Sequence, residues 1–289
     1  LIWQARSVIL RVMRLEFEKM HGIGNDFVVM AEPAGSPGFS PEVIRRIADR
    51  RMGIGCDQVL IAAASDRDDA DVTMRIFNAD GSSAKQCGNG IRCFARFVRD
   101  RGIVANGSTV RVDTPSGVVE ARFLEDGRVR ANLGVPDFSP AAIPMRVGEQ
   151  SDGYRLRLGG EQFTIGAVSM GNPHAVLRVD NAESAPVATI GPKIQNHEWF
   201  PDSVNVGFMQ VLSRGQVRLR VYERGVGETM ACGSGACAAV AVGVRQGLID
   251  RRVRVDLNGG SLDIEWGDDR ASMWMTGPAT RVYQGEIEL

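Results

Sequence analysis

The chain contains 289 residues, of which 44% are hydrophobic and 24% are charged, as in an ordinary globular protein. Its 34 lysines and arginines are offset by 35 aspartates and glutamates, which leaves a formal net charge of -1. The chain therefore lacks the basic surplus of nucleic-acid-binding proteins, and no apolar run is long enough to predict a membrane span. We expect a small-molecule ligand, with neither nucleic acid nor membrane as a partner.

The cysteines indicate the redox surroundings of the chain. Their number is odd, and their spacing fits neither a disulfide framework nor the paired ligands of a zinc site. They are Cys56, Cys87, Cys93, Cys232 and Cys237. We infer a reducing, cytoplasmic location and expect no metal and no other cofactor.

The first dozen residues read as an extension that precedes the fold. Residues 1–12 hold arginines and no acidic residue, and their longest apolar run, Val8 to Leu10, is too short for the core of a signal peptide. The first strand-like run begins directly after Met13. We therefore expect the folded chain to begin near Met13.

The first half of the chain reads as strands, then a helix, then strands. Runs of β-branched and apolar residues predict the first strands, over 14–17, 27–30, 58–62 and 72–77. Phe94, Phe97 and Val98 recur at helical spacing and predict a helix over 91–101, with Gly102 as its left-handed terminus. Further strands are expected over 110–112, 118–123 and 129–133.

The second half of the sequence repeats the first. Cys232-Gly233-Ser234-Gly235 follows Cys87-Gly88-Asn89-Gly90 by 145 positions, and Gly247 follows Gly102 by the same offset. Upstream, an offset of 147 lays Gly171-Asn172 on Gly24-Asn25 and Asn205 on Gln58. The repeat predicts a second helix over 236–246, with strands over 253–257, 262–266 and 271–276.

These elements predict an α+β fold rather than a doubly wound sheet, because strands and helices do not alternate. We expect two pseudo-symmetric units from an internal duplication, each a curved, barrel-like mixed sheet around a central helix. The first unit spans 13–132 and the second spans 133–278. A last strand within 279–289 is expected to return to the first unit.

The repeated Cys-Gly-x-Gly segments, called the elbows below, combine a thiol with an anion site. Their glycines allow backbone N–H groups to crowd an anion, and the start of a helix adds partial positive charge. The same field favours a thiolate and is expected to lower the pKa of each cysteine. Two opposed elbows are what inversion at an acidic C–H requires, because one thiolate removes the proton and one thiol returns it from the other face.

Several longer motifs give the chain a resemblance to a known family. They include Gly22-x-Gly24-Asn25-Asp26-Phe27, Phe77-Asn78-Ala79-Asp80-Gly81, Gly171-Asn172-Pro173-His174, and Glu223-Arg224-Gly225 followed by Cys232-Gly233-Ser234-Gly235. From about Met13 to the C-terminus the chain resembles bacterial diaminopimelate epimerases, relatives of proline racemase. The resemblance implies a homodimer that converts LL-2,6-diaminopimelate to the meso form without a cofactor, for the synthesis of lysine and peptidoglycan.

The resemblance also implies roles for individual residues. Cys87 and Cys232 match the two proton carriers, and His174 and Glu223 match positions that tune them. The residues that match substrate contacts are Asn25, Gln58, Asn78, Gly88, Asn89, Asn172, Asn205, Glu223, Arg224, Gly233 and Ser234. Arg224 is suited to hold a distal carboxylate in a fork.

Other interpretations remain open at this point. A proline or hydroxyproline racemase shares the logic of paired cysteines, although a cyclic imino acid offers no distal carboxylate to Arg224. A dithiol redox protein would cycle Cys87 and Cys232 between thiols and a disulfide, and a binding protein for diamino acids would show no turnover. Asn25, Asn78, Asn172 and Asn205 could each serve only to cap a helix or form a turn. Cys56, Cys93 and Cys237 are expected to be buried structural thiols.

Overall fold

The computed structural model describes residues 14–33, 35, 38–84 and 88–288. The expected N-terminal extension and the candidate proton carrier Cys87 lie outside the described residues. Within the described part of the chain, no helix combines the length and apolar character needed to cross a bilayer.

The described residues of the first half form seven strands and two helices. They are β1 (Arg14–Gly22), β2 (Asn25–Ala31), α1 (Pro41–Ala48), β3 (Gln58–Ala63), β4 (Val72–Asn78), α2 (Gly88–Asp100), β5 (Thr109–Thr114), β6 (Gly117–Phe123) and β7 (Val129–Asn132).

The second half contains the remaining described elements. They are β8 (Tyr154–Leu158), β9 (Glu161–Ser169), β10 (Pro173–Arg178), α3 (Val187–Gln195), β11 (Asn205–Ser213), β12 (Gln216–Glu223), β13 (Gly227–Thr229), α4 (Gly233–Arg245), β14 (Arg252–Leu257), β15 (Gly260–Trp266), β16 (Met273–Gly277) and β17 (Thr280–Glu288).

The strand pairings reproduce the duplication. The parallel pair β2–β3 has its counterpart in β10–β11, and the parallel pair β4–β5 has its counterpart in β12–β14. The register matches as well, because Phe27 lies opposite Gln58 as His174 lies opposite Asn205. The predicted α+β class and the pseudo-symmetric arrangement of two halves are therefore confirmed.

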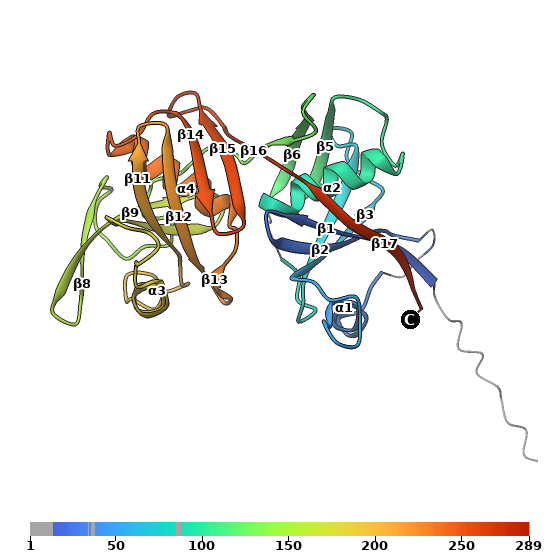
Figure 1. Ribbon diagram of the computed structural model, residues 1–289, viewed down its shortest axis with the longest axis horizontal. Coiled ribbons are helices and arrows are strands. Elements are labelled where there is room, and N and C mark those ends of the chain that lie inside the picture. Colours follow the sequence, from blue (N-terminus) through green and yellow to red (C-terminus); the bar gives the residue numbers. More distant parts are fainter. Residues whose placement is uncertain (1–13, 34, 36–37, 85–87, 289) are drawn as a thin grey trace, which may run out of the picture.

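Two strands connect the halves (Figure 1). β7 of the first half pairs antiparallel with β16 of the second, so that one hydrogen-bonded sheet runs through both halves. β17, at the end of the chain, lies beside β1 over nearly its whole length in the first half. The exact division at residues 132 and 133 stays a prediction.

Each half wraps around one central helix. α4 is buried from Gly233 to Gly243, and its glycines, alanines and valines are small enough for strands to approach on all sides. α2 buries Phe94, Phe97 and Val98, as predicted, and belongs to the same hydrophobic core as α4. Outside this core, α1 and α3 cover the outer faces of their own halves.

Some local predictions were wrong. Both central helices begin at the first glycine of an elbow, about three residues before the predicted starts. The elbow residues therefore form the first turn of each helix, whose backbone N–H groups point out of the helix start. The helices α1 and α3 were not predicted. The signal for α1 was present, since Ser40 caps it and Pro41 opens it, whereas α3 begins after Pro186 and contains Pro192. Gly102 and Gly247 have the predicted left-handed conformation, with φ of 65° and 69°.

Candidate active site

The two elbows meet head to head although they lie 145 residues apart. A methyl group added to Gly88 would come within 3.5 Å of the Cα of Gly233 and the backbone nitrogen of Ser234. The N-termini of α2 and α4 therefore face the same small region, to which the start of a helix presents backbone N–H groups. Such a pair of helix starts favours an anion between them.

The second elbow is held by a network around Ser234. The hydroxyl of Ser234 lies 3.7 Å from the sulfur of Cys232, 3.1 Å from Nε2 of His174 and 3.3 Å from Nδ2 of Asn172. Oδ1 of Asn172 lies 3.0 Å from the same imidazole nitrogen. Cys232 is a free thiol, buried at the residue before α4. Four of the predicted site residues thus contact one another directly.

The electrostatics of this elbow differ from the prediction. Burial raises the pKa of Cys232 well above its ordinary value, and the nearby carboxylate of Glu223 raises it further. A hydrogen bond from the backbone N–H of Gly235 acts in the opposite direction but does not prevail. The expected lowering of the Cys232 pKa by the helix start is therefore wrong for this structure, because loss of water and a neighbouring anion outweigh the helix field.

Two further groups at this elbow are perturbed by burial. Desolvation raises the pKa of Glu223, which accepts hydrogen bonds from Thr229 at 2.5 Å and from Cys232. Desolvation lowers the pKa of His174 to about 3, and the positive charge of Arg224 adds to this effect. At neutral pH the imidazole of His174 is therefore uncharged.

The first elbow is described from Gly88 onward and is organised by Asn89. The Nδ2 of this buried side chain donates to the carbonyl oxygen of Ala231 at 3.1 Å and to Oδ1 of Asn25 at 3.4 Å. Asn25 in turn donates to Asp57 at 2.8 Å. The contact of Asn25 with Asn89 is the counterpart of the contact of Asn172 with Ser234, so the duplication extends to side-chain pairs.

The remaining predicted residues lie at the ends of strands, where they form hydrogen bonds with other residues of the strand ends and loops. Gln58 donates to Asn78 at 3.0 Å. Asn205 is buried, donates to the carbonyl oxygen of Pro173 at 3.0 Å and accepts from the backbone N–H of Arg224 at 2.9 Å. The exposed guanidinium of Arg224 donates to the carbonyl oxygen of Asp202.

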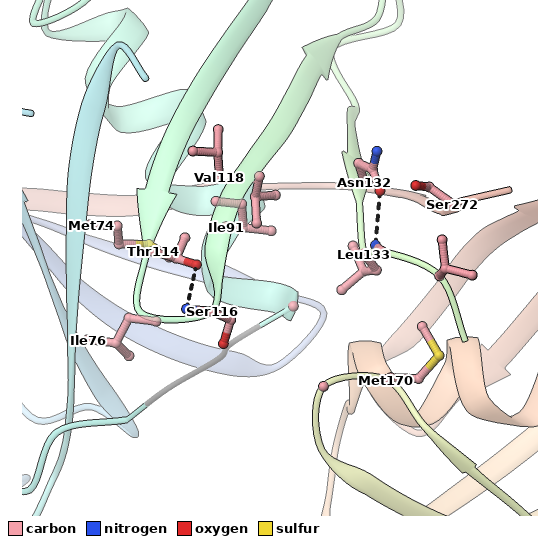
Figure 2. A pocket seen from close by; sticks show the side chains of 15 residues that line it. Met74, Ile76, Ile91, Thr114, Ser116, Val118, Asn132, Leu133, Met170 and Ser272 are labelled. Atoms are coloured by element: carbon pink, nitrogen blue, oxygen red, sulfur yellow. Dashed lines mark hydrogen bonds between the residues drawn. The ribbon is translucent and has the colours of Figure 1, made fainter. Parts of the chain in front are cut away.

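A separate cavity lies beside the first elbow (Figure 2). Its volume is about 360 Å³, and its walls come from both halves. Met74 and Ile76 lie on one side of it, and Leu133 and Met170 lie on the other. Of the predicted site residues that the structure describes, only Gly88 lines this cavity.

Three residues around the elbows were missed by the sequence analysis. Asp57 accepts a hydrogen bond from Asn25, and Thr229 donates one to Glu223. Arg92 donates a hydrogen bond to Asn89 at 3.1 Å. Asp57 directly precedes Gln58, but no spacing rule linked it to Asn25. The described part of the chain contains no group of three or more His, Cys, Asp or Glu side chains arranged to hold a metal ion.

Comparison with solved structures defines the class of fold. The chain superposes on the crystal structure of a probable proline racemase from Agrobacterium radiobacter K84, which holds bound carbonate, with a TM-score of 0.70. The match covers 95% of this chain and 93% of that chain at 17% identity. The protein therefore has the two-lobed fold of that racemase.

Sequence relatives define the family within this class. A family model described as diaminopimelate epimerase matches residues 17–139 and 166–282. The diaminopimelate epimerase of Thioalkalivibrio sulfidiphilus is 54% identical over 279 residues, and that of Alkalilimnicola ehrlichii is 52% identical over 278 residues. Each match covers 96% of this chain and 100% of the relative. The chain belongs to the diaminopimelate epimerase family, which is a family of isomerases.

Proposed function

We propose that this chain interconverts LL- and meso-2,6-diaminopimelate by moving one proton between the two faces of an α-carbon. The observation that carries this proposal is the identity of more than half of all aligned residues with diaminopimelate epimerases over their full length. The abutting elbows support it, because both helix starts face the same region.

In the proposed reaction one thiolate takes the α-proton and the opposite thiol supplies its own proton to the other face of the carbanion. The raised pKa of Cys232 favours its thiol form, so Cys232 is the proton donor and Cys87 the base in one direction. The reverse reaction exchanges these roles. Each turnover converts the thiolate to a thiol and the opposite thiol to a thiolate, so the total charge of the two sulfurs is unchanged.

The carbanion needs stabilisation, which we assign to the elbows. The reacting carboxylate would sit at the N–H groups of Gly88, Asn89, Gly233 and Ser234, where the partial positive charges of α2 and α4 add together. These dipoles are fixed before the reaction by the contacts of Asn89 and Ser234. The preorganised field lowers the barrier without reorganisation of solvent.

Recognition of the distal end of diaminopimelate is assigned to polar groups at the strand ends. Arg224 and the amides of Asn78, Asn172 and Asn205 would bind the distal carboxylate, with Asn25 and Gln58 alongside. Glu223 would attract an ammonium group. A ligand that lacks the distal groups would leave these side chains unpaired, which disfavours proline and lysine.

The setting of the enzyme is also proposed. We expect a homodimer in the cytoplasm, where a reducing environment keeps Cys87 and Cys232 as thiols. Sedimentation velocity under reducing conditions measures the oligomeric state, and a monomer at micromolar concentration would contradict the proposed dimer.

The function is tested by proton exchange in D2O with reductant present, followed by NMR. LL-diaminopimelate, meso-diaminopimelate, L-proline and L-lysine are compared. We expect α-deuterium only in diaminopimelate, together with formation of the second epimer. Exchange in proline alone would assign the chain to the racemase branch, and exchange in none of the four would overturn the proposal. Activity of only the disulfide form would favour a redox protein.

A further inference from the structure

A buried arginine lies beneath the two elbows. Arg92 is 0% exposed and sits in the second turn of α2, at the position that Cys237 occupies in the repeat. Its Nε donates to the carbonyl oxygen of Pro278 at 3.2 Å, and its Nη1 lies 3.4 Å from the Sδ of Met275. The side chain therefore connects α2 to the strand end of the other half.

The surroundings leave room for this guanidinium and for little else. A methyl group added to Gly22 would come within 2.8 Å of Nη2 of Arg92, and one added to Gly277 would come within 3.2 Å of Nε. Glycine at both positions thus admits the arginine from two sides. This close fit indicates that the arginine is held in one place.

Asn89 extends the contacts of Arg92 to the second elbow. Nη1 of Arg92 donates to Oδ1 of Asn89 at 3.1 Å and lies 3.4 Å from the carbonyl oxygen of Gly88. With Oδ1 bound to Arg92, the amide presents Nδ2 to the carbonyl oxygen of Ala231, the residue before Cys232, at 3.1 Å. A chain of two hydrogen bonds thus joins the first half to the cysteine loop of the second.

We propose that Arg92 is a positioning residue that, through Asn89, holds the Cys232 elbow in place against the start of α2. The proposal rests on the proposed function, because two-sided proton transfer requires both elbows at a fixed separation. In the repeat, Ser234 is held instead by His174 and Asn172, within the second half. Among the described residues, Asn89 of the first elbow therefore reaches across the halves, whereas the bonds of Ser234 stay within its own half.

The tie is the pair of hydrogen bonds from Arg92 to Asn89 and from Asn89 to Ala231. Its loss should change the ratio of proton exchange to inversion, which a general loss of stability would not do. A displaced Cys232 would fail to return a proton, while removal of the α-proton at the other face continues. The carbanion would then be reprotonated by the thiol that formed it, after that thiol has exchanged with solvent. Deuterium would accumulate in recovered substrate at the expense of inversion.

The test compares Arg92→Met and Asn89→Ser with wild type in D2O. Asn89→Ser introduces the residue found in the repeat and keeps the backbone N–H groups of the elbow, so it serves if Arg92→Met does not fold. For both variants we expect inversion to fall about ten-fold or more, with an increased ratio of exchange to inversion. Arg96→Met is the matched control, because Arg96 lies one turn further along α2 and donates to the carbonyl oxygen of Ala279, away from the elbows.

A second measurement does not depend on the substrate. In a Cys87→Ala background, iodoacetamide labelling is followed at each cysteine by mass spectrometry. Cys232 is 4% exposed, and loss of its tie should speed its labelling about five-fold, the effect of one lost buried hydrogen bond. Cys56, buried in the core beneath α1, reports general unfolding and should label as slowly as before.

The outcomes separate this proposal from the proposed function. If wild type does not epimerise diaminopimelate, the function fails, and the labelling of Cys232 still tests the tie. The tie is overturned if Asn89→Ser labels Cys232 no faster than the parent, or if exchange and inversion fall in equal proportion. It is also overturned if Arg96→Met produces the same changes as Arg92→Met.

Discussion

The two elbows have the same backbone design and different surroundings. In each, an asparagine from the neighbouring strand end contacts the second residue of the helix, Asn25 to Asn89 and Asn172 to Ser234. Behind Asn89 lies the buried cation of Arg92, whereas behind Ser234 lies the uncharged imidazole of His174. Glu223 adds a carboxylate to the second elbow, where it raises the pKa of Cys232.

This comparison shows how a duplicated fold can give two copies of one backbone motif different chemical surroundings. The helix starts and glycines supply the same anion-binding backbone twice. Individual side chains then raise the pKa of Cys232, through burial and the charge of Glu223. A two-base reaction requires one sulfur to accept a proton while the other donates one, and the raised pKa of Cys232 favours the donor state of its thiol.

Removing the thiol of one elbow is expected to have the largest effect on activity. Cys232→Ala should reduce epimerisation by about 10³-fold, within the range that loss of a general acid or base causes. Cys237→Ala is the matched control, since Cys237 is a fully buried thiol one turn further along α4. Steady-state kinetics under reducing conditions measure both variants. Turnover of Cys232→Ala near that of Cys237→Ala would exclude the two-thiol reaction.

The uncharged state of His174 should make stability depend on pH. Its pKa is about 3 in the folded protein and about 6.5 when unfolded, so stability is fully present above pH 6.5 and is lost as the pH falls toward 3. Between pH 7 and 4.5 this one group should cost roughly 2 to 3 kcal/mol. His174→Phe, which introduces the residue found at Phe27 in the repeat, should remove that part of the decline.

Chemical denaturation at several pH values measures this difference. His197→Phe is the control for the loss of an imidazole, because His197 packs on Trp199 away from the elbows. An equal decline in His174→Phe and wild type would show that the imidazole is not held uncharged.

A smaller effect is expected from neutralising Glu223. Glu223→Gln removes the negative charge that raises the pKa of Cys232, so this pKa should fall and more thiolate should form at neutral pH. Labelling of Cys232 by iodoacetamide, in a Cys87→Ala background, should become about three- to ten-fold faster. Glu228→Gln is the matched control, since Glu228 binds Arg220 rather than the thiol. An unchanged labelling rate in Glu223→Gln would show that the carboxylate of Glu223 does not raise the pKa of Cys232.

Much of the fold followed from local pattern. The repeat in sequence fixed the equivalence of Gln58 with Asn205 and of Asn25 with Asn172, and the strand registers agree with it. The first central helix was placed by the spacing of apolar residues and the second by the repeat, each within about three residues of its start. By contrast, α3 has a proline inside it and little amphipathic pattern, so its helical state depends on packing against β11 and β12.

The sequence by itself determined the duplication, the α+β class, the positions of the paired cysteines and the family. These properties are encoded in residue order, in periodicity and in short motifs, which are local in the chain. Only the tertiary structure decided that Arg92 meets Asn89, that Asn89 reaches Ala231, and that Cys232 is shielded beside Glu223. Contacts between distant residues and the loss of water around a thiol arise from packing, and they outweigh the field of a helix start.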